Sequence, residues 1–195
     1  MKISIILGHP TPGSFNHAIA ATAKAAIEQG GHEVWFHDLY AERFEPVMQT
    51  VELPKDSPIP ADLGRHCDEI VRADGIVIVH PNYWSQPPAI LKGWLDRVLR
   101  AGLAYQFVPD GQGGGKAVGL LKARRALVIT TANTPQDKEI EFLGDPLEGL
   151  WKKVVFGLCG VPCERLIFSP VIVSTPEQRQ QWLEEVTVRV RALFS

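Results

Sequence analysis

The chain has 195 residues, of which 45% are hydrophobic and 22% are charged, a composition typical of a folded globular protein. At this length the simplest organisation is one domain over residues 1–195, large enough to bury a core without disulfide bonds. The 20 basic and 22 acidic residues give a formal net charge of −2, so the chain lacks the basic surface that nucleic acid or an anionic membrane requires.

The cysteines and the lengths of the apolar runs indicate the cellular compartment of the protein. Cys67, Cys159 and Cys163 are odd in number and cannot all pair within the chain, which fits a reducing compartment. The first apolar run, Ile3–Leu7, is too short for the core of a signal peptide, and no stretch approaches the ~18 apolar residues of a membrane span. We therefore expect a cytoplasmic protein without a membrane span.

Apolar segments of strand length alternate with segments of helical periodicity, which is the pattern of βαβ units. The first, third and fourth of these apolar segments are continuous, as expected for strands buried on both faces of a parallel sheet. The predicted strands are Ile3–Leu7, Glu33–Phe36, Ile76–Val79, Ala126–Thr131 and Arg165–Val173.

Between and after these strands, apolar side chains recur every three or four residues, which predicts helices. Gly30 and Gly31 provide a stop for the first helix. In the last helix Thr175 is a candidate cap, Pro176 suits the first turn and Gln178 completes a capping-box spacing. The apolar stripes span residues 15–26, 63–71, 91–99, 147–158 and 183–193.

Two connections are long. Residues 38–60 contain Pro46, Pro54, Pro58 and Pro60, and residues 102–123 contain an Asp-Gly pair and a run of three glycines, so we expect both connections to be irregular. Loops of this length inside a compact domain are usually functional or lie at an interface.

The alternation of strands and helices predicts an α/β fold, a doubly wound five-stranded parallel sheet in the order 2-1-3-4-5 with helices on both faces. In such a sheet, ligands bind beyond the carboxyl ends of the strands, where the strand order reverses. Strands one, three and four are neighbours in this order. The loops at residues 8–16, 80–88 and 130–135 therefore converge on one crevice.

The first of these loops has the composition of a phosphate site. Gly13 permits close backbone approach, Ser14 is placed as the N-cap, and the first turn of a helix offers free N–H groups and the positive end of the helix dipole. An ordinary strand-to-helix turn with a serine cap explains the same residues.

The second loop places Tyr83 and Trp84 in a proline-bounded turn beside Asn82 and Ser85. Aromatic faces next to polar groups suit a flat heteroaromatic ligand, although both rings could instead fill the core. The third loop reads Thr-Thr-Ala-Asn at residues 130–133, which suits either a ligand or a simple turn.

Three other segments partly match a known functional motif, but each lies in the wrong structural context or lacks a required residue. The Cys159–Arg165 segment has phosphatase spacing but runs from a helix to a strand, whereas the nucleophile loop should run from a strand to a helix. A nucleotide-binding loop at residues 110–117 lacks its first glycine and its final serine or threonine. His32 and Glu33 lack the second histidine of a zinc helix, so we predict no metal site.

Five short segments share a pattern with a known family of proteins: Gly8–Pro10, Ser14–Asn16, His80–Trp84, Pro88–Trp94 and Ala104–Tyr105. In these segments the chain resembles the NAD(P)H:quinone oxidoreductase (DT-diaphorase) family of flavodoxin-like flavoproteins, which also includes modulators of drug activity and ancillary subunits of potassium-efflux systems. The similarity extends in matching order over nearly the whole chain, and its most specific part is the run Pro88–Trp94.

The resemblance implies a bound flavin, either FAD or FMN, with NAD(P)H as co-substrate. Its phosphate or pyrophosphate would lie near His9, Ser14, Phe15 and Asn16. Its isoalloxazine ring would lie along Pro81, Asn82, Tyr83 and Trp84, and the pyrimidine edge of the ring would face Thr130, Thr131, Ala132 and Asn133. The family forms homodimers, and by that pattern Tyr105 and Phe107 would reach into the partner's site to bind substrate.

One departure concerns the chemistry. Well-studied members carry Thr-Thr-Gly-Gly followed by a Tyr and a His that stabilise the reduced flavin, whereas this chain has Ala132, Asn133 and then Leu143 in place of the histidine. We therefore assign no catalytic side chain. Backbone N–H groups around Ala132 and Asn133, with Lys138, are expected to stabilise the developing charge.

The activity that the resemblance implies is ping-pong hydride transfer from NAD(P)H through the flavin to a quinone or similar planar acceptor. One alternative is a non-catalytic flavin module, either an electron carrier or a regulatory subunit of a transporter. A sheet protein without any cofactor is a third class.

Overall fold

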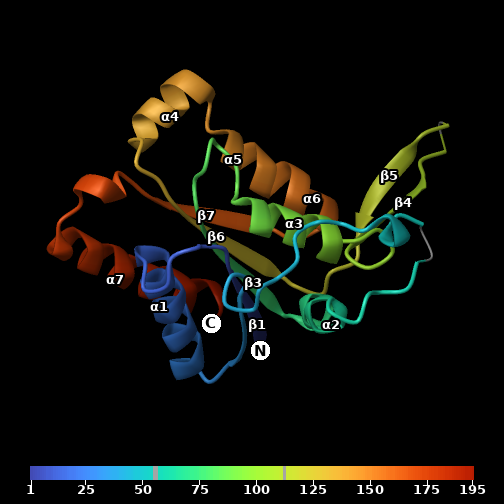
Figure 1. The fold of residues 1–195 in the computed structure, drawn as a ribbon, viewed down its shortest axis with the longest axis horizontal. Helices are drawn as coiled ribbons and strands as arrows, with labels where there is room; N and C mark the ends of the chain where they lie inside the picture. Colours follow the sequence, from blue (N-terminus) through green and yellow to red (C-terminus); the bar gives the residue numbers. More distant parts are fainter. Residues whose placement is uncertain (55–56, 112) are drawn as a thin grey trace.

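A five-stranded parallel sheet forms the centre of the molecule (Figure 1). This computed structural model describes residues 1–54, 57–111 and 113–195, so residues 55–56 and 112 of the two long connections lie outside the described residues. The sheet order β2-β1-β3-β6-β7 becomes 2-1-3-4-5 when these strands are counted alone, which confirms the predicted fold class. The strands are β1 (Lys2–Leu7), β2 (Glu33–Asp38), β3 (Gly75–Pro81), β6 (Arg125–Thr131) and β7 (Cys163–Phe168).

The central strands are covered on both faces. Every residue of β3 is buried, and successive side chains along it point to opposite faces. On one face Ile76 and Ile78 pack with Trp94 and Trp151, whereas on the other Val77 belongs to a separate apolar cluster. Continuous apolar runs are required where both faces are buried, which is why these strands were predictable.

Helices α1 and α7 cover one face, and α2, α3, α5 and α6 cover the other (Figure 1). Ser14 and Thr175 cap α1 and α7 as predicted, since their side chains accept from the backbone N–H groups of His17 and Gln178. No helix among the described residues is both long and apolar enough to cross a bilayer. Four predicted helices are present as α1 (Phe15–Gln29), α2 (Gly64–Arg72), α3 (Ala89–Val98) and α7 (Pro176–Leu193). The helix predicted from the apolar stripe at residues 147–158 divides into α5 (Pro146–Gly149), a π-helical turn η2 (Leu150–Val155) and α6 (Phe156–Cys159).

The fifth strand is shorter than predicted. It ends at Phe168 instead of Val173, because Pro170 has no N–H to donate to a ladder and Val171–Val173 form the 3-10 helix η3. Helix α4 (Gln136–Leu143) was not predicted. It has no buried residue, so it carries no apolar stripe that packs against the sheet.

The prediction that residues 102–123 are irregular is wrong. They contain β4 (Tyr105–Pro109) and β5 (Gly115–Gly119), which pair as an antiparallel hairpin. The hairpin projects from the side of the molecule opposite α4 (Figure 1). Its side chains are mostly exposed or half-buried, so the strands lack the alternation of a strand with one buried face.

The described part of the 38–60 connection is irregular apart from the 3-10 helix η1 (Thr50–Glu52), and it is held firmly against α3. Arg97 of α3 is 2% exposed, and its guanidinium donates to the Glu52 carboxylate and to the Glu45 carbonyl. Gly93, one turn earlier in α3, packs so closely on Pro46 that a Cβ at this position would lie 2.2–2.4 Å from three Pro46 atoms.

This close approach predicts a large effect of Gly93→Ala. The added methyl must displace the backbone at Pro46, so the free energy of unfolding should fall by about 2 kcal/mol or more. Urea denaturation measures it. Gly64→Ala is the matched control, since nothing lies within 4 Å of a Cβ there and alanine favours helix; equal losses in the two variants would contradict the packing argument.

Candidate functional site

The loops that follow β1, β3 and β6 meet at one cavity of about 320 Å³. It is lined by all the residues predicted to bind a cofactor except Trp84 and Thr130. Val171 and Arg179, which were not predicted, also line it. The lining residues are His9, Ser14, Phe15, Asn16, Pro81, Asn82, Tyr83, Thr131, Ala132, Asn133, Val171 and Arg179.

One end of the cavity is suited to an anion. Helix α1 begins there and has no acidic residue in its first turn, so its free N–H groups and dipole present positive potential. Arg179 adds a full positive charge. Its Nε donates to Ser174 Oγ at 2.8 Å, its Nη2 donates to the Val171 carbonyl at 3.2 Å, and its guanidinium lies 5.7 Å from the centre of the Phe15 ring.

Two histidines border the same end. His17 Nε2 lies 3.1 Å from the Asp38 carboxylate, which only accepts, so this nitrogen carries a proton. In the tautomer with this proton on Nε2, the Nδ1 atom accepts from Ser14 Oγ at 2.8 Å. His9 Nδ1 accepts the Thr11 N–H at 3.1 Å, and burial lowers the pKa of His9, so its neutral ring has a donor N–H at Nε2.

The cavity also contains buried acceptors without partners. Asn16 Nδ2 donates to Thr131 Oγ1 at 2.9 Å, but Asn16 Oδ1 and Asn82 Oδ1 have no partner among the described residues. Thr130 does not line the cavity; it is 1% exposed, and its Oγ1 also has no partner among the described residues. An unpaired buried acceptor costs about 1–3 kcal/mol, a cost that a ligand with N–H or O–H donors would remove.

A second cavity of about 570 Å³ adjoins the first, since both are lined by Asn82, Tyr83, Ala132 and Asn133. The other residues that line it are Trp84, Ser85, Thr134, Glu139, Leu143 and Pro146. Tyr83 is 43% exposed and Trp84 is 98% exposed, which excludes the interpretation that both rings fill the core. Trp84 thus lies at the rim of the second cavity, outside the first.

Some groups with a predicted role lie outside both cavities or are already paired. Tyr105 and Phe107 are on the β4–β5 hairpin and line neither cavity. Lys138 donates to Glu141 at 2.6 Å and lines neither cavity, and the Ala132 N–H donates to the Phe168 carbonyl at 3.0 Å. The Ala132 N–H is therefore not free to stabilise charge in the site, and Lys138 lines neither cavity. The expected role of the Asn133 N–H stays a prediction.

The turn after β3 is anchored by His80, which is fully buried. His80 Nδ1 donates to the Pro81 carbonyl at 2.8 Å, and Nε2 accepts from Trp151 Nε1 at 3.0 Å. Burial lowers the pKa of His80 to about 4, so the ring is neutral near pH 7. This neutral ring fixes the direction in which the chain enters the site.

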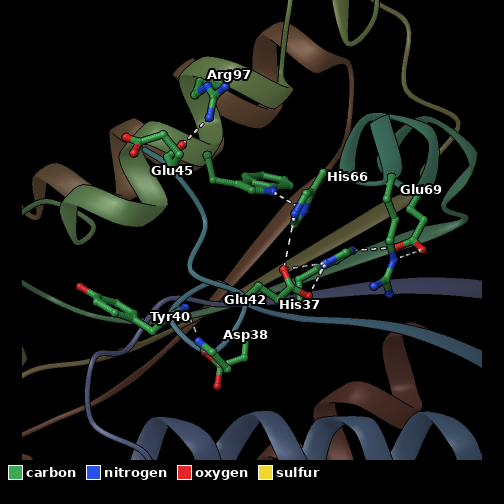
Figure 2. A network of polar contacts seen from close by, with 11 residues as sticks. His37, Asp38, Tyr40, Glu42, Glu45, His66, Glu69 and Arg97 are labelled. Carbon is green, nitrogen blue, oxygen red and sulfur yellow. Dashed lines mark hydrogen bonds and ion pairs between the residues drawn. The ribbon is translucent and has the colours of Figure 1, made fainter. Parts of the chain in front are cut away.

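A second histidine cluster was missed by the sequence analysis because its members lie on separate elements (Figure 2). His37 of β2 meets Glu69 of α2 at 2.6 Å and Glu42 at 3.0 Å, while His66 Nε2 lies 3.4 Å from Glu42. Candidate ligand atoms of His37, Glu42 and His66 lie within 4.8 Å of one another, a spacing that could suit a metal ion.

Hydrogen bonds to the ring nitrogens of this cluster favour a structural role over metal binding. Trp94 Nε1 donates to His66 Nδ1 at 3.2 Å, so the neutral His66 ring carries its proton on Nε2, which lies 3.4 Å from Glu42 Oε2. Burial lowers the pKa of His66 to about 4, in agreement with a neutral ring. We interpret the cluster as a clasp that ties the start of the 38–60 connection to α2 and α3.

The buried neutral histidines predict how stability depends on pH. Below pH ~6.5 the side chains of His66 and His80 bind protons in the unfolded chain but stay neutral while they are buried in the folded protein. The free energy of unfolding should therefore fall as the pH is lowered from about 6.5 to about 4. His80→Gln removes one of these groups and should flatten that slope by up to about 1.4 kcal/mol per pH unit. Urea titrations across this range measure it; an unchanged slope would contradict the neutral assignment.

The fold and the cavity define a doubly wound α/β protein with a cavity at the point where the strand order reverses. A family profile described as "Flavodoxin-like fold" matches residues 1–193, so the chain belongs to the flavodoxin-like fold family.

Among curated relatives, the uncharacterized NAD(P)H oxidoreductase of Haemophilus influenzae is 34% identical over 197 residues, which span 98% of this chain and 95% of the relative. The NAD(P)H dehydrogenase [quinone] 1 of Rattus norvegicus is 38% identical over 214 residues, which span 97% of this chain and 76% of the relative. The solved NAD(P)H:quinone oxidoreductase from Methanothermobacter marburgensis superposes with a TM-score of 0.80 at 25% identity and covers 98% of this chain and 96% of its own.

Proposed function

We propose that this chain is a flavin-dependent NAD(P)H:quinone oxidoreductase, in which NAD(P)H and a quinone or similar planar acceptor occupy the site in turn. The observation that carries the proposal is the cavity itself. It joins an anion-binding end at Ser14 and Arg179 to an open aromatic and polar end at Tyr83 and Asn133. The names of the relatives in Haemophilus influenzae and Rattus norvegicus support the same activity.

The residues of the cavity fit FMN or FAD. The start of α1 and Arg179 suit the phosphate or pyrophosphate, together with the His9 donor. The unpaired oxygens of Asn16 and Asn82 can accept hydrogen bonds from the hydroxyl or N–H groups that a flavin carries. We assign to cofactor binding His9, Ser14, Phe15, Asn16, Pro81, Asn82, Tyr83, Trp84, Thr130, Thr131, Ala132, Asn133 and Arg179.

A bound flavin would accept hydride from the nicotinamide and deliver electrons to the quinone. The chain contributes binding, orientation and electrostatics. The second cavity, with Tyr83 and Trp84 on its wall, is the place where the two reactants stack alternately. We assign no side chain as a proton donor or acceptor in the reaction.

The substrate site extends across a homodimer in this proposal. Phe107 is 63% exposed, and its ring lies edge to face with that of Tyr105 at 5.8 Å. This pair of rings lies on a projecting hairpin and lines neither cavity of its own chain, so it is suited to close the site of a second copy. We propose that residues 1–195 act as one flavodoxin-like domain of such a dimer, working in the cytoplasm.

The cofactor and the turnover are tested together on the purified protein. Heat release should yield FMN or FAD, and NADH or NADPH oxidation should be rapid with added menadione. Bound flavin with little turnover would favour an electron carrier or a regulatory subunit. Colourless protein that takes up neither FMN nor FAD would contradict the proposal.

Arg179→Met should weaken flavin binding. Removing a positive charge that faces a phosphate should raise the dissociation constant about tenfold or more, as measured by quenching of flavin fluorescence. Arg189→Met removes an exposed arginine of the same helix, which pairs with Glu164 of β7, and should leave the dissociation constant unchanged. Equal effects of the two substitutions would show that Arg179 does not face the cofactor.

The dimer is tested through Phe107. The wild-type chain should sediment as a dimer, and Phe107→Ala should lower kcat/KM for menadione about fivefold or more without lowering the flavin content, because the ring would close the partner's site. Val188→Ala, on the exposed face of α7, is the control. A monomer with full turnover would exclude this role for the hairpin.

A further inference from the structure

The second cavity has a charged side chain to which the proposed function assigns no role. Its wall includes the aromatic rings of Tyr83 and Trp84 and the apolar side chains of Leu143 and Pro146. Among the described residues that line this cavity, Glu139 alone carries a full charge. The cavity that would receive the reactants therefore has apolar and neutral polar walls and carries negative charge at one point.

The Glu139 carboxylate is fixed in place. Its Oε1 atom accepts from Ser85 Oγ at 2.6 Å and from Asn82 Nδ2 at 3.2 Å. Both donors belong to the turn after β3, in which Trp84 and Ser85 adopt left-handed backbone conformations with φ of 56°. Glu139 thus connects α4 to this turn and holds its charge at the wall of the cavity.

The charge of Glu139 is not neutralised locally. Lys138, its neighbour in α4, pairs with Glu141 at 2.6 Å, and no cation among the described residues lies within ion-pair distance of Glu139. Arg179 and the start of α1 lie on the first cavity and do not line the second. The two adjoining cavities therefore have opposite polarity, with a positive end for an anionic group and a negative wall beside the aromatic rings.

We propose that Glu139 is a specificity-determining residue, which makes the second cavity discriminate against planar acceptors that carry a sulfonate or carboxylate and accept neutral or cationic ones. This inference rests on the proposed function. Like charges a few ångströms apart in a partly solvated cavity repel enough to change binding roughly three- to tenfold. Glu139 acts here by its charge, not by proton transfer.

The test compares two naphthoquinones, neutral menadione and anionic 1,2-naphthoquinone-4-sulfonate, in the flavin-loaded protein. Glu139→Gln keeps an oxygen that can accept from Ser85 and Asn82 but removes the charge. It should raise kcat/KM for the sulfonate about three- to tenfold and change that for menadione less than twofold. Glu141→Gln, which removes a carboxylate of the same helix outside the cavity lining, should change neither value.

Equilibrium binding gives a second readout that does not depend on turnover. The sulfonate should quench tryptophan fluorescence, and its dissociation constant should fall by the same factor in Glu139→Gln. Glu139→Asp retains the charge and should keep the wild-type discrimination, which separates a charge effect from a general loosening of α4.

The outcomes separate the two claims. If the wild type reduces both quinones and Glu139→Gln leaves their ratio unaltered, or if Glu141→Gln changes it equally, the role of Glu139 is contradicted while the proposed function stands. If the wild type reduces neither quinone, the proposed function fails. In that case an unchanged dissociation constant for the sulfonate in Glu139→Gln would overturn the inference as well.

Discussion

The structure depends on the burial of β1, β3 and β6 between two layers of helices. Because these strands are parallel and covered on both faces, their carboxyl ends have to emerge together at one edge of the sheet. The strand order reverses between β1 and β3, so the loops after these two strands lead to helices on opposite faces of the sheet and leave a crevice between them. The apolar core therefore fixes where polar chemistry can occur, and the side chains of the loops determine which chemistry it is.

The polar groups of the site are held by contacts that begin in the core. His80 is neutral because it is buried, and its bonds to Pro81 and Trp151 direct the turn that carries Tyr83. Arg179 is oriented by the η3 segment, which forms because β7 ends before Pro170. In consequence the positive end at Arg179 and the negative wall at Glu139 lie on adjoining cavities.

The sheet, its order and most of the first cavity could be predicted from sequence because they depend on local patterns. Continuous apolar runs identified β3 and β6, and a Ser14 cap followed by a helical stripe identified the start of α1. The hairpin and α4 could not be predicted, since neither buries an apolar face. Arg179 looks like any arginine of an amphipathic helix, and the His37 and His66 clasp joins elements that only the tertiary fold brings together.

We propose that the loops after β1, β3 and β6 form a slot for a flavin, with its anionic tail at the start of α1. A crystal structure of the protein grown with FMN would reveal whether they do. We expect the phosphate within hydrogen-bond distance of the first turn of α1 and of Arg179, with the ring system beside Tyr83 and Asn133. A crystal in which this cavity holds no flavin, or in which FMN binds at another face, would contradict it.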